Sequence, residues 1–199
     1  MRKLLTFICC MLVAGCALVK ATYYKPLVDG YYKGACGGPD NYGAKKLNEK
    51  LAYFVYVVSD CKESTSAIKI GFNFRVHPGS VLTLTSGTVI VNGSNYHQEL
   101  PICTIQKQEW KADEKQLVKT EFKYSAPLIG YPESRLQTSK FGLSEILKWG
   151  GYSFEFTIPP YSGNELFITL PGLIIDGQYV TPDVLKVIKT TEYYWQFNC

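Results

Sequence analysis

The chain has 199 residues, of which 46% are hydrophobic and 19% charged, and its formal net charge is +4 at pH 7. This composition is typical of an ordinary globular protein, in one domain or at most two small ones. It has no cluster rich in lysine and arginine, which argues against nucleic-acid binding. Tyrosine is abundant, at 15 residues, and β-branched residues fill the apolar runs, so the composition favours strands over helices.

The first residues have the layout of a signal peptide. Arg2 and Lys3 form a positive region, and residues 4–14 form an apolar run about half as long as the ~20 residues of a membrane-spanning helix. The run ends in Leu12-Val13-Ala14-Gly15-Cys16. This motif resembles the lipobox of bacterial lipoprotein precursors. The resemblance implies a signal peptide over residues 1–15, lipidation of Cys16 and attachment to a membrane through the lipid.

Ala17, which follows the cysteine, bears on location. In the enterobacterial sorting scheme, the lack of an aspartate at this position implies passage to the outer membrane. The resemblance therefore implies a lipid-anchored protein of the cell envelope, on the periplasmic face or the surface of the outer membrane. Each buried methylene contributes about 0.8 kcal/mol, so several acyl chains anchor a domain stably. Ordinary secretion is the alternative, with cleavage after Ala17 or Ala21.

The seven cysteines fall into three groups. Cys9 and Cys10 lie in the leader, Cys16 is the lipidation site, and the mature chain keeps Cys36, Cys61, Cys103 and Cys199. An even number of distant cysteines in an oxidising compartment predicts two disulfides, with three connectivities open. We favour Cys36–Cys61, the nearest pair in sequence, and Cys103–Cys199, which would fasten the last residue to the sheet. None forms a CxxC pair, which argues against zinc and thioredoxin-like chemistry.

Residues 16–42 are predicted to form a tether and an arm made of loops and turns. Glycine, proline, aspartate and asparagine are dense from Gly34 to Asn41, as is typical of such segments. The paired tyrosines of the arm predict that it lies against the domain. Cys36 could be the nucleophile of a ligand-cradling loop. However, neither a histidine nor a helix start accompanies it, so we interpret the segment as a loop held by a disulfide.

Residues 43–199 are predicted to form an all-β domain, a disulfide-stabilised antiparallel β-sandwich of immunoglobulin-like type with one short helix. Leu51–Val58 is apolar on both faces, which predicts a central strand. The next strand, over residues 68–76, alternates between apolar residues and Lys69, Gly71, Asn73 and Arg75, so one of its faces should be wet. Ser86-Gly87 predicts a hairpin loop that places Leu84 opposite Val89.

The second half of the chain is less regular. Residues 107–119 are the most charged stretch, and we expect them to form a solvated connection. Leu143–Trp149 is the predicted helix, because Leu143 and Leu147 are four residues apart and Gly150-Gly151 follows. Further strands are predicted over residues 100–105, 118–124, 152–158, 166–175 and 184–199.

Two parts of the chain resemble each other. Three blocks match in spacing and character: Phe72–Pro78 with Phe154–Pro160, Leu82–Leu84 with Ile168–Leu170, and Val89–Gly93 with Leu173–Gly177. The second copy is shorter by two residues between its last two blocks, which leaves each side chain on its original face of a strand. The pattern predicts duplicated halves over about residues 66–105 and 152–190. The alternative is two unrelated hairpins with similar alternation.

The sequence offers little chemistry. It lacks G-x-S-x-G, HExxH, a phosphate-binding glycine-rich loop and a calcium loop, so we expect no enzyme, no cofactor and no metal site. Carboxylates such as Glu155 and Asp183 are expected to be salt-bridge partners. Of the two histidines, His77 precedes Pro78 in a predicted turn. His97 has Glu99 nearby, yet a lone loop histidine is more often a solvated side chain than a base.

Aromatic residues are the best candidates for a binding surface, since tyrosine and tryptophan combine a large apolar area with a polar tip. Neighbouring strand residues point to opposite faces, so Tyr194 is a better surface candidate than Tyr193 or Trp195. Tyr23, Tyr31 and Tyr194 are the candidate binding residues. We hypothesise a binding or scaffolding module with an envelope protein or a glycan as partner. The alternatives are a glycan- or cell-wall-binding module that uses exposed aromatics and a periplasmic hydrolase or inhibitor with a site near His97.

Overall fold

The structure is a computed structural model that describes residues 17–28, 30–31, 42–59, 67–111, 116–133 and 146–196. Most of these residues lie in strands, and every ladder between strands is antiparallel. The prediction of an all-β antiparallel fold is therefore confirmed. The predicted helix is reduced, within the described residues, to one turn of 3-10 helix, η1 (Ile146–Lys148).

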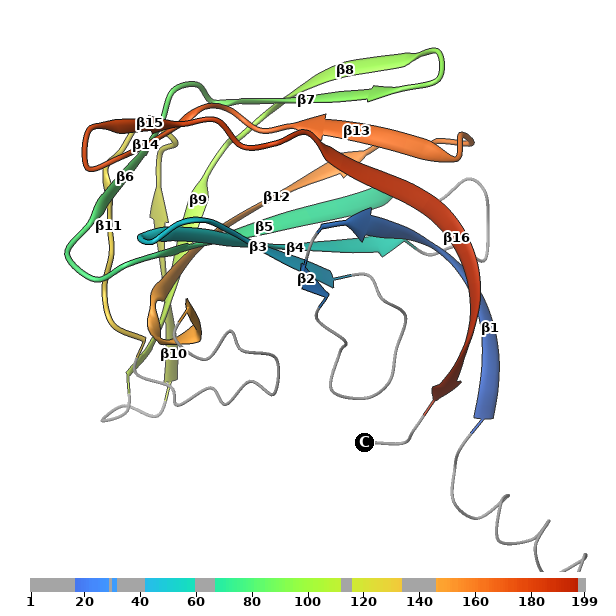
Figure 1. Ribbon diagram of the computed structural model, residues 1–199, viewed down its shortest axis with the longest axis horizontal. Coiled ribbons are helices and arrows are strands. Elements are labelled where there is room, and N and C mark those ends of the chain that lie inside the picture. The colour runs from blue at the N-terminus through green and yellow to red at the C-terminus, as the bar shows by residue number, and fades with distance from the viewer. Residues whose placement is uncertain are drawn as a thin grey trace, which may run out of the picture.

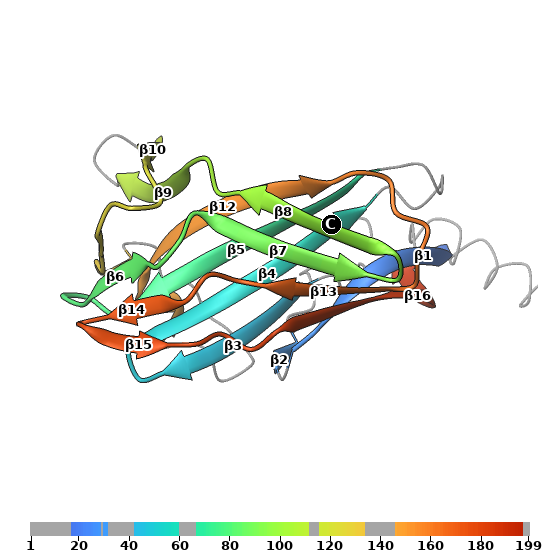
Figure 2. The same ribbon diagram turned by 90° about the horizontal axis from the view of Figure 1, so that it is seen from above.

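The strands form three sheets (Figures 1 and 2). Sheet A has the order β1 (Ala17–Leu27), β16 (Leu185–Gln196), β13 (Glu165–Thr169), β7 (Thr88–Gly93) and β8 (Tyr96–Pro101). Sheet B has the order β10 (Gln116–Phe122), β9 (Ile105–Lys111), β12 (Gly150–Ile158), β5 (Ile68–Val76), β4 (Leu51–Ser59), β3 (Tyr42–Asn48) and β2 (Gly30–Tyr31). Sheet C has the order β11 (Leu128–Ile129), β6 (Val81–Leu84), β14 (Leu173–Ile175) and β15 (Gln178–Val180).

Sheet B lies opposite sheets A and C, and one hydrophobic core fills the space between these layers (Figure 1). Alternation along each strand builds this core, since every second residue of β5 is buried while Lys69 is exposed. At its centre the rings of Phe72 and Phe154 stack with centroids 5.6 Å apart. The described residues contain sixteen strands, more than the about seven to nine of an immunoglobulin domain, so that part of the prediction is not confirmed.

β4 is an interior strand, as predicted, but only one of its faces is fully buried, since Val58 on the other face is 48% exposed. Leu51, Tyr53, Val55 and Val57 face the main core, and all are nearly inaccessible to solvent. On the other face Ala52 packs with residues of the η1 segment in a second, smaller cluster. The outer face of sheet B, which is the face turned away from the main core, is therefore covered at one end.

The N-terminal residues that were predicted to be loops form a strand instead. β1 pairs with β16 along its whole length, from Ala17 opposite Gln196 to Leu27 opposite Lys186. The buried hydroxyl of Tyr24 donates to the carbonyl oxygens of Tyr161 and Gly163. β1 is therefore the edge of sheet A rather than a tether. Residues 29 and 32–41 lie outside the described residues.

Two further predictions were wrong. Residues 107–119 do not form a plain connection, because within them β9 and β10 pair and add an edge to sheet B. Charged side chains suit such an edge, since they discourage pairing with another chain. β6 and β7 do not form a hairpin either: Leu84 lies opposite Leu173 and Val89 opposite Leu100, in different sheets.

The two similar parts of the chain meet in sheet B. β5 and β12 are neighbours, and Phe72 lies opposite Phe154, its match in the other copy. Ile70 lies opposite Phe156, and Phe74 opposite Tyr152. If each residue is replaced by its match in the other copy, the same set of pairs results. The ladder therefore has the symmetry of a two-fold axis that passes through the Phe72–Phe154 pair.

The other ladders follow the same rule. Leu82 of β6 lies opposite Ile175 of β14, and Ile168 of β13 lies opposite Val91 of β7. Since Leu82 matches Ile168 and Val91 matches Ile175, the exchange converts one pair into the other. A common origin of the halves stays a prediction, and this agreement of register supports it.

The match ends at the hairpin turns that follow these strands. Asp176 and Gly177, both with positive φ, form the turn between β14 and β15. The corresponding residues Asn92 and Gly93 lie inside β7, and the turn before β8 comes two residues later, with Asn95 at a positive φ. The turn of the first copy is therefore displaced relative to that of the second.

Candidate functional site

The structure does not gather the tyrosines that were predicted to bind a partner. Tyr23 is only 4% exposed, and its hydroxyl donates to a carboxylate oxygen of Glu192 at 2.5 Å. It therefore presents no ring to solvent, and this prediction was wrong. Tyr31 and Tyr194 lie in β2 and β16, but their side chains fall outside the described part of the structure.

The predicted disulfides receive no support. Cys103 is a free, exposed cysteine, so the predicted Cys103–Cys199 bond is absent from the structure. Its Sγ atom lies 4.0 Å from the carbonyl oxygen of Pro101, two residues earlier in the chain. Cys16, Cys36, Cys61 and Cys199 lie outside the described residues. Lipidation of Cys16 and the Cys36–Cys61 bond therefore stay predictions.

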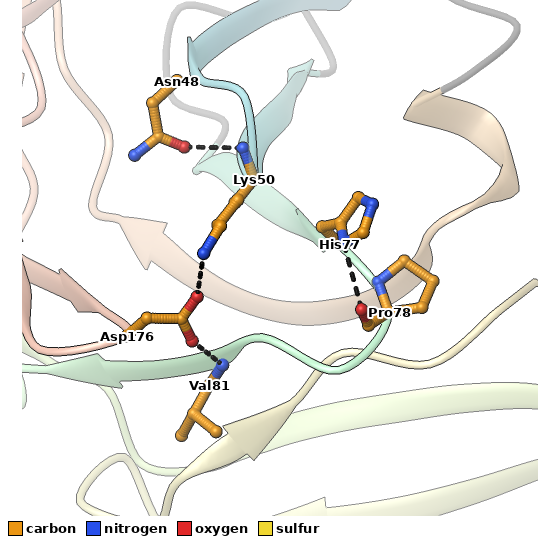
Figure 3. Close-up of polar contacts among 6 residues, drawn as sticks. All are labelled: Asn48, Lys50, His77, Pro78, Val81 and Asp176. Carbon is orange, nitrogen blue, oxygen red and sulfur yellow. Dashed lines mark hydrogen bonds and ion pairs between the residues drawn. The ribbon is translucent and has the colours of Figure 1, made fainter.

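The two histidines lie at separate places. His97 is exposed on the β7–β8 hairpin, where its Nδ1 lies 2.7 Å from Oδ1 of Asn92. His77 is exposed in the turn after β5, and its Nδ1 lies 3.0 Å from the carbonyl oxygen of Pro78 (Figure 3). The His77 ring contacts the edge of Trp149, with centroids 5.4 Å apart. Neither histidine lines the polar groove on the outer face of sheet B.

A polar groove of about 670 Å³ lies on the outer face of sheet B, and we call it the outer groove. This volume falls within the range of small-ligand sites, about 300–1,000 Å³. The groove crosses β4, β5, β12, β9 and β10, together with the segment before β9. It is lined by Tyr56, Lys69, Asn73, Cys103, Thr104, Gln106, Lys119, Ser153, Phe154 and Glu155.

The floor of the groove depends on a glycine. Gly71 of β5 lies opposite Tyr56 of β4 on one side and opposite Glu155 of β12 on the other. A Cβ atom at Gly71 would come within 2.1 Å of the Tyr56 ring, so only glycine leaves room for this ring against the sheet. Tyr56 can therefore lie across β5 and donate a hydrogen bond from its hydroxyl to Glu155.

Glu155 is the centre of a charged network in the groove. It accepts the Tyr56 hydrogen bond and forms an ion pair with Lys69. Partial burial would raise the pKa of Glu155, but the hydrogen bonds from Lys69 and Tyr56 outweigh it and lower this pKa. Burial and the hydrogen bond to Glu155 raise the pKa of Tyr56. Lys119 acts on Glu155 through its charge without a hydrogen bond.

An amide completes one wall. Asn73 of β5 lies opposite Ser153 of β12, and its Oδ1 atom is buried without a hydrogen-bond partner. Ser153 lies in turn opposite Gln106 of β9, whose Nε2 donates to Glu121 at 3.2 Å. A buried acceptor without a partner costs about 1–3 kcal/mol, so Asn73 gains from any nearby donor.

One end of the outer face is closed by a buried arginine. Nη1 of Arg75 donates to the carbonyl oxygen of Trp149 at 2.9 Å and lies 3.6 Å from the carboxylate of Glu133. The guanidinium also lies over the ring of Phe54. Burial lowers the pKa of Arg75 although Glu133 opposes the shift. These contacts attach the covering segments to sheet B and leave the groove in the open part of the face.

Some of these residues could be found from sequence. The outward face of β5 was predicted and contributes Lys69 and Asn73 to the groove, although only Lys69 on this face is exposed. Glu155 was predicted to be a salt-bridge partner, as it is for Lys69, and Asp183 likewise pairs with Lys45. Tyr56, Gln106 and Lys119 were missed as groove residues, because their place depends on which strands are neighbours.

Comparisons with known proteins assign no family: no family model, no curated protein and no solved structure matches the chain. Within the described ranges, no helix has the length and apolar character needed to cross a membrane. Those same residues contain no group of three or more histidine, cysteine, aspartate or glutamate side chains able to hold a metal ion.

Proposed function

We propose that the protein is a lipid-anchored component of the outer membrane, held by Cys16, that binds a partner in the outer groove. The observation that carries the binding role is the groove itself, an open concave surface with charged, amide and hydroxyl groups from neighbouring strands. Binding sites are typically such concave surfaces with a few convergent polar groups. The lipid anchor rests on the resemblance of the leader to a lipobox.

The chemistry of Glu155 favours binding over catalysis. A general acid or base works best with a pKa near the working pH. The pKa of Glu155 is lowered by its hydrogen bonds with Lys69 and Tyr56, so this carboxylate stays ionised at neutral pH. An ionised carboxylate with fixed neighbours is suited to accepting hydrogen bonds from a ligand.

The proposed anchor fits the position of β1. This strand begins at Ala17, directly after the proposed lipid-bearing residue, and is paired from its first residue. The anchor therefore leaves no free tether, and the domain is held close to the membrane. A Cys36–Cys61 disulfide, suited to the oxidising envelope, belongs to the same proposal.

Gentle detergent extraction of the native protein, with mass spectrometry of its N-terminal peptide and of bound molecules, tests the proposal. We expect an acylated Cys16 in the membrane fraction and release of the Cys16→Ala variant into the soluble fraction. A bound partner should be lost from Tyr56→Ala. It should be kept by Tyr179→Ala, since Tyr179 is 64% exposed on sheet C. An unacylated Cys16 would contradict the anchor, and a partner lost only from Tyr179→Ala would contradict the groove.

A further inference from the structure

The position of the groove decides how a ligand is recognised. It lies mainly over β4, β5, β12 and β9, which are interior strands of sheet B. Along the groove β5 is paired on both sides, whereas β12 is paired with β9 only at Tyr152 and Ser153. Over β4 and β5 a ligand is therefore recognised through side chains, because a peptide that adds as a strand needs a free sheet edge.

Those side chains both donate and accept hydrogen bonds. Asn73 and Gln106 carry amides, Thr104 and Ser153 carry hydroxyls, and Glu155 carries an ionised carboxylate. Sugar hydroxyls likewise donate and accept, so this mixture is complementary to a ligand rich in hydroxyl groups. The Oδ1 atom of Asn73 is buried, so it is not among the acceptors that face a ligand.

Two aromatic rings flank the polar groups. Tyr42 of β3 lies opposite Tyr56 in the ladder, and their ring centroids are 6.0 Å apart at an interplanar angle of 36°. Tyr42 is 38% exposed. Tyrosine offers a flat apolar ring together with a polar tip, which suits the flat C–H faces of a pyranose ring.

The groove also offers a positive charge to a ligand. Lys69 is paired with Glu155, but Lys119 forms no ion pair with any carboxylate in the described part of the chain. Lys119 is exposed, so it is open to an anionic group on a ligand. A charge-assisted hydrogen bond of this kind is about twice as strong as a neutral one.

We propose that the outer groove binds an oligosaccharide that carries carboxylate groups, with its hydroxyls on Gln106 and Glu155 and a carboxylate on Lys119. The inference rests on the groove being the binding site of the proposed function, but not on the lipid anchor. It assigns a ligand class to a surface that sequence comparison leaves without one.

Titration calorimetry of the full-length protein in detergent tests this assignment. The probe is a tetrasaccharide of alternating glucuronate and N-acetylglucosamine, and the neutral tetrasaccharide of N-acetylglucosamine is its uncharged counterpart. We expect the acidic sugar to bind more tightly, and Lys119→Ala to weaken its binding by about tenfold or more. Lys123→Ala removes a nearby exposed lysine that does not line the groove, and it should change nothing.

A second measurement does not depend on a variant. Cys103 lines the groove as a free, exposed cysteine, so saturation with the acidic sugar should slow its alkylation in the wild-type protein. Equal binding of both sugars, unaffected by Lys119→Ala, would overturn the anionic assignment. If an acidic peptide protects Cys103 and neither sugar does, the carbohydrate inference is wrong and the binding role stands. If Tyr56→Ala also keeps every co-purifying partner, the proposed function fails as well.

Discussion

Single side chains join parts of this fold that are far apart in sequence. Asp176, in the β14–β15 turn, accepts hydrogen bonds from Nζ of Lys50 at 2.7 Å and from the backbone N–H of Val81 at 2.8 Å (Figure 3). The hydrogen bonds with Lys50 and Val81 lower the pKa of Asp176 to about 2. Lys50 lies in the β3–β4 turn, so Asp176 links sheet B to sheet C.

This contact makes stability depend on pH. The pKa of Asp176 is lower in the folded protein than its usual value of 3.8, so its contribution is present above about pH 4 and is lost as the pH falls towards 2. Asp176→Asn keeps a residue that tolerates the positive φ, and it removes the charge and one of the two acceptor oxygens. We expect the variant to have a lower urea midpoint at pH 7, with a difference that shrinks between pH 4 and pH 2. Parallel profiles would contradict this role of Asp176.

The residues of the groove show how far sequence reasoning extends. The alternation of apolar and polar residues predicted the outward face of β5, which carries Lys69 and Asn73. It could not show that Tyr56 lies over Gly71, because that contact depends on β4 pairing with β5 in one particular register. Local pattern predicts which face a residue occupies, whereas the partners of that face are set by the long-range order of the strands.

β1 shows the limits of prediction for a whole element. Glycine and proline between residues 34 and 41 suggested an irregular arm, and Pro26 supported that interpretation. Pro26 nevertheless lies within β1, opposite Val187, and an edge strand tolerates a proline because one side of it needs no ladder. The prediction that tyrosines of the arm lie against the domain is confirmed for Tyr23 and Tyr24, which are buried.

A mutation can test whether β1 is part of the folded domain. Tyr24→Phe removes the hydroxyl that donates to Tyr161 and Gly163, and we expect a loss of about 1 kcal/mol in the free energy of unfolding. Tyr193→Phe is the matched control on β16, since Tyr193 is 65% exposed, and it should change stability little. Urea denaturation measures both. If Tyr24→Phe were as stable as the control, β1 would not be tied to the domain through this contact.

At the scale of the whole molecule, the groove lies where the two similar parts of the chain meet. Their core-facing residues are alike, since Phe72 matches Phe154 and Phe74 matches Phe156. Their outward residues differ, since Asn73 matches Glu155. The shared residues support the layered core, while the differing ones supply the polar groups of the groove. This division is expected of two copies that keep a fold and acquire a site between them.

We propose that the outer groove is the surface through which this protein binds its partner. Photo-cross-linking in intact cells tests it most directly, with a photoreactive residue placed at Thr104 in the groove or at Tyr179 on sheet C. Both positions are exposed. Thr104 lies in the connection between β8 and β9, and Tyr179 lies in β15 of sheet C. We expect an adduct from position 104 and none from position 179. An adduct from position 179 alone would show that the partner binds elsewhere than in the outer groove.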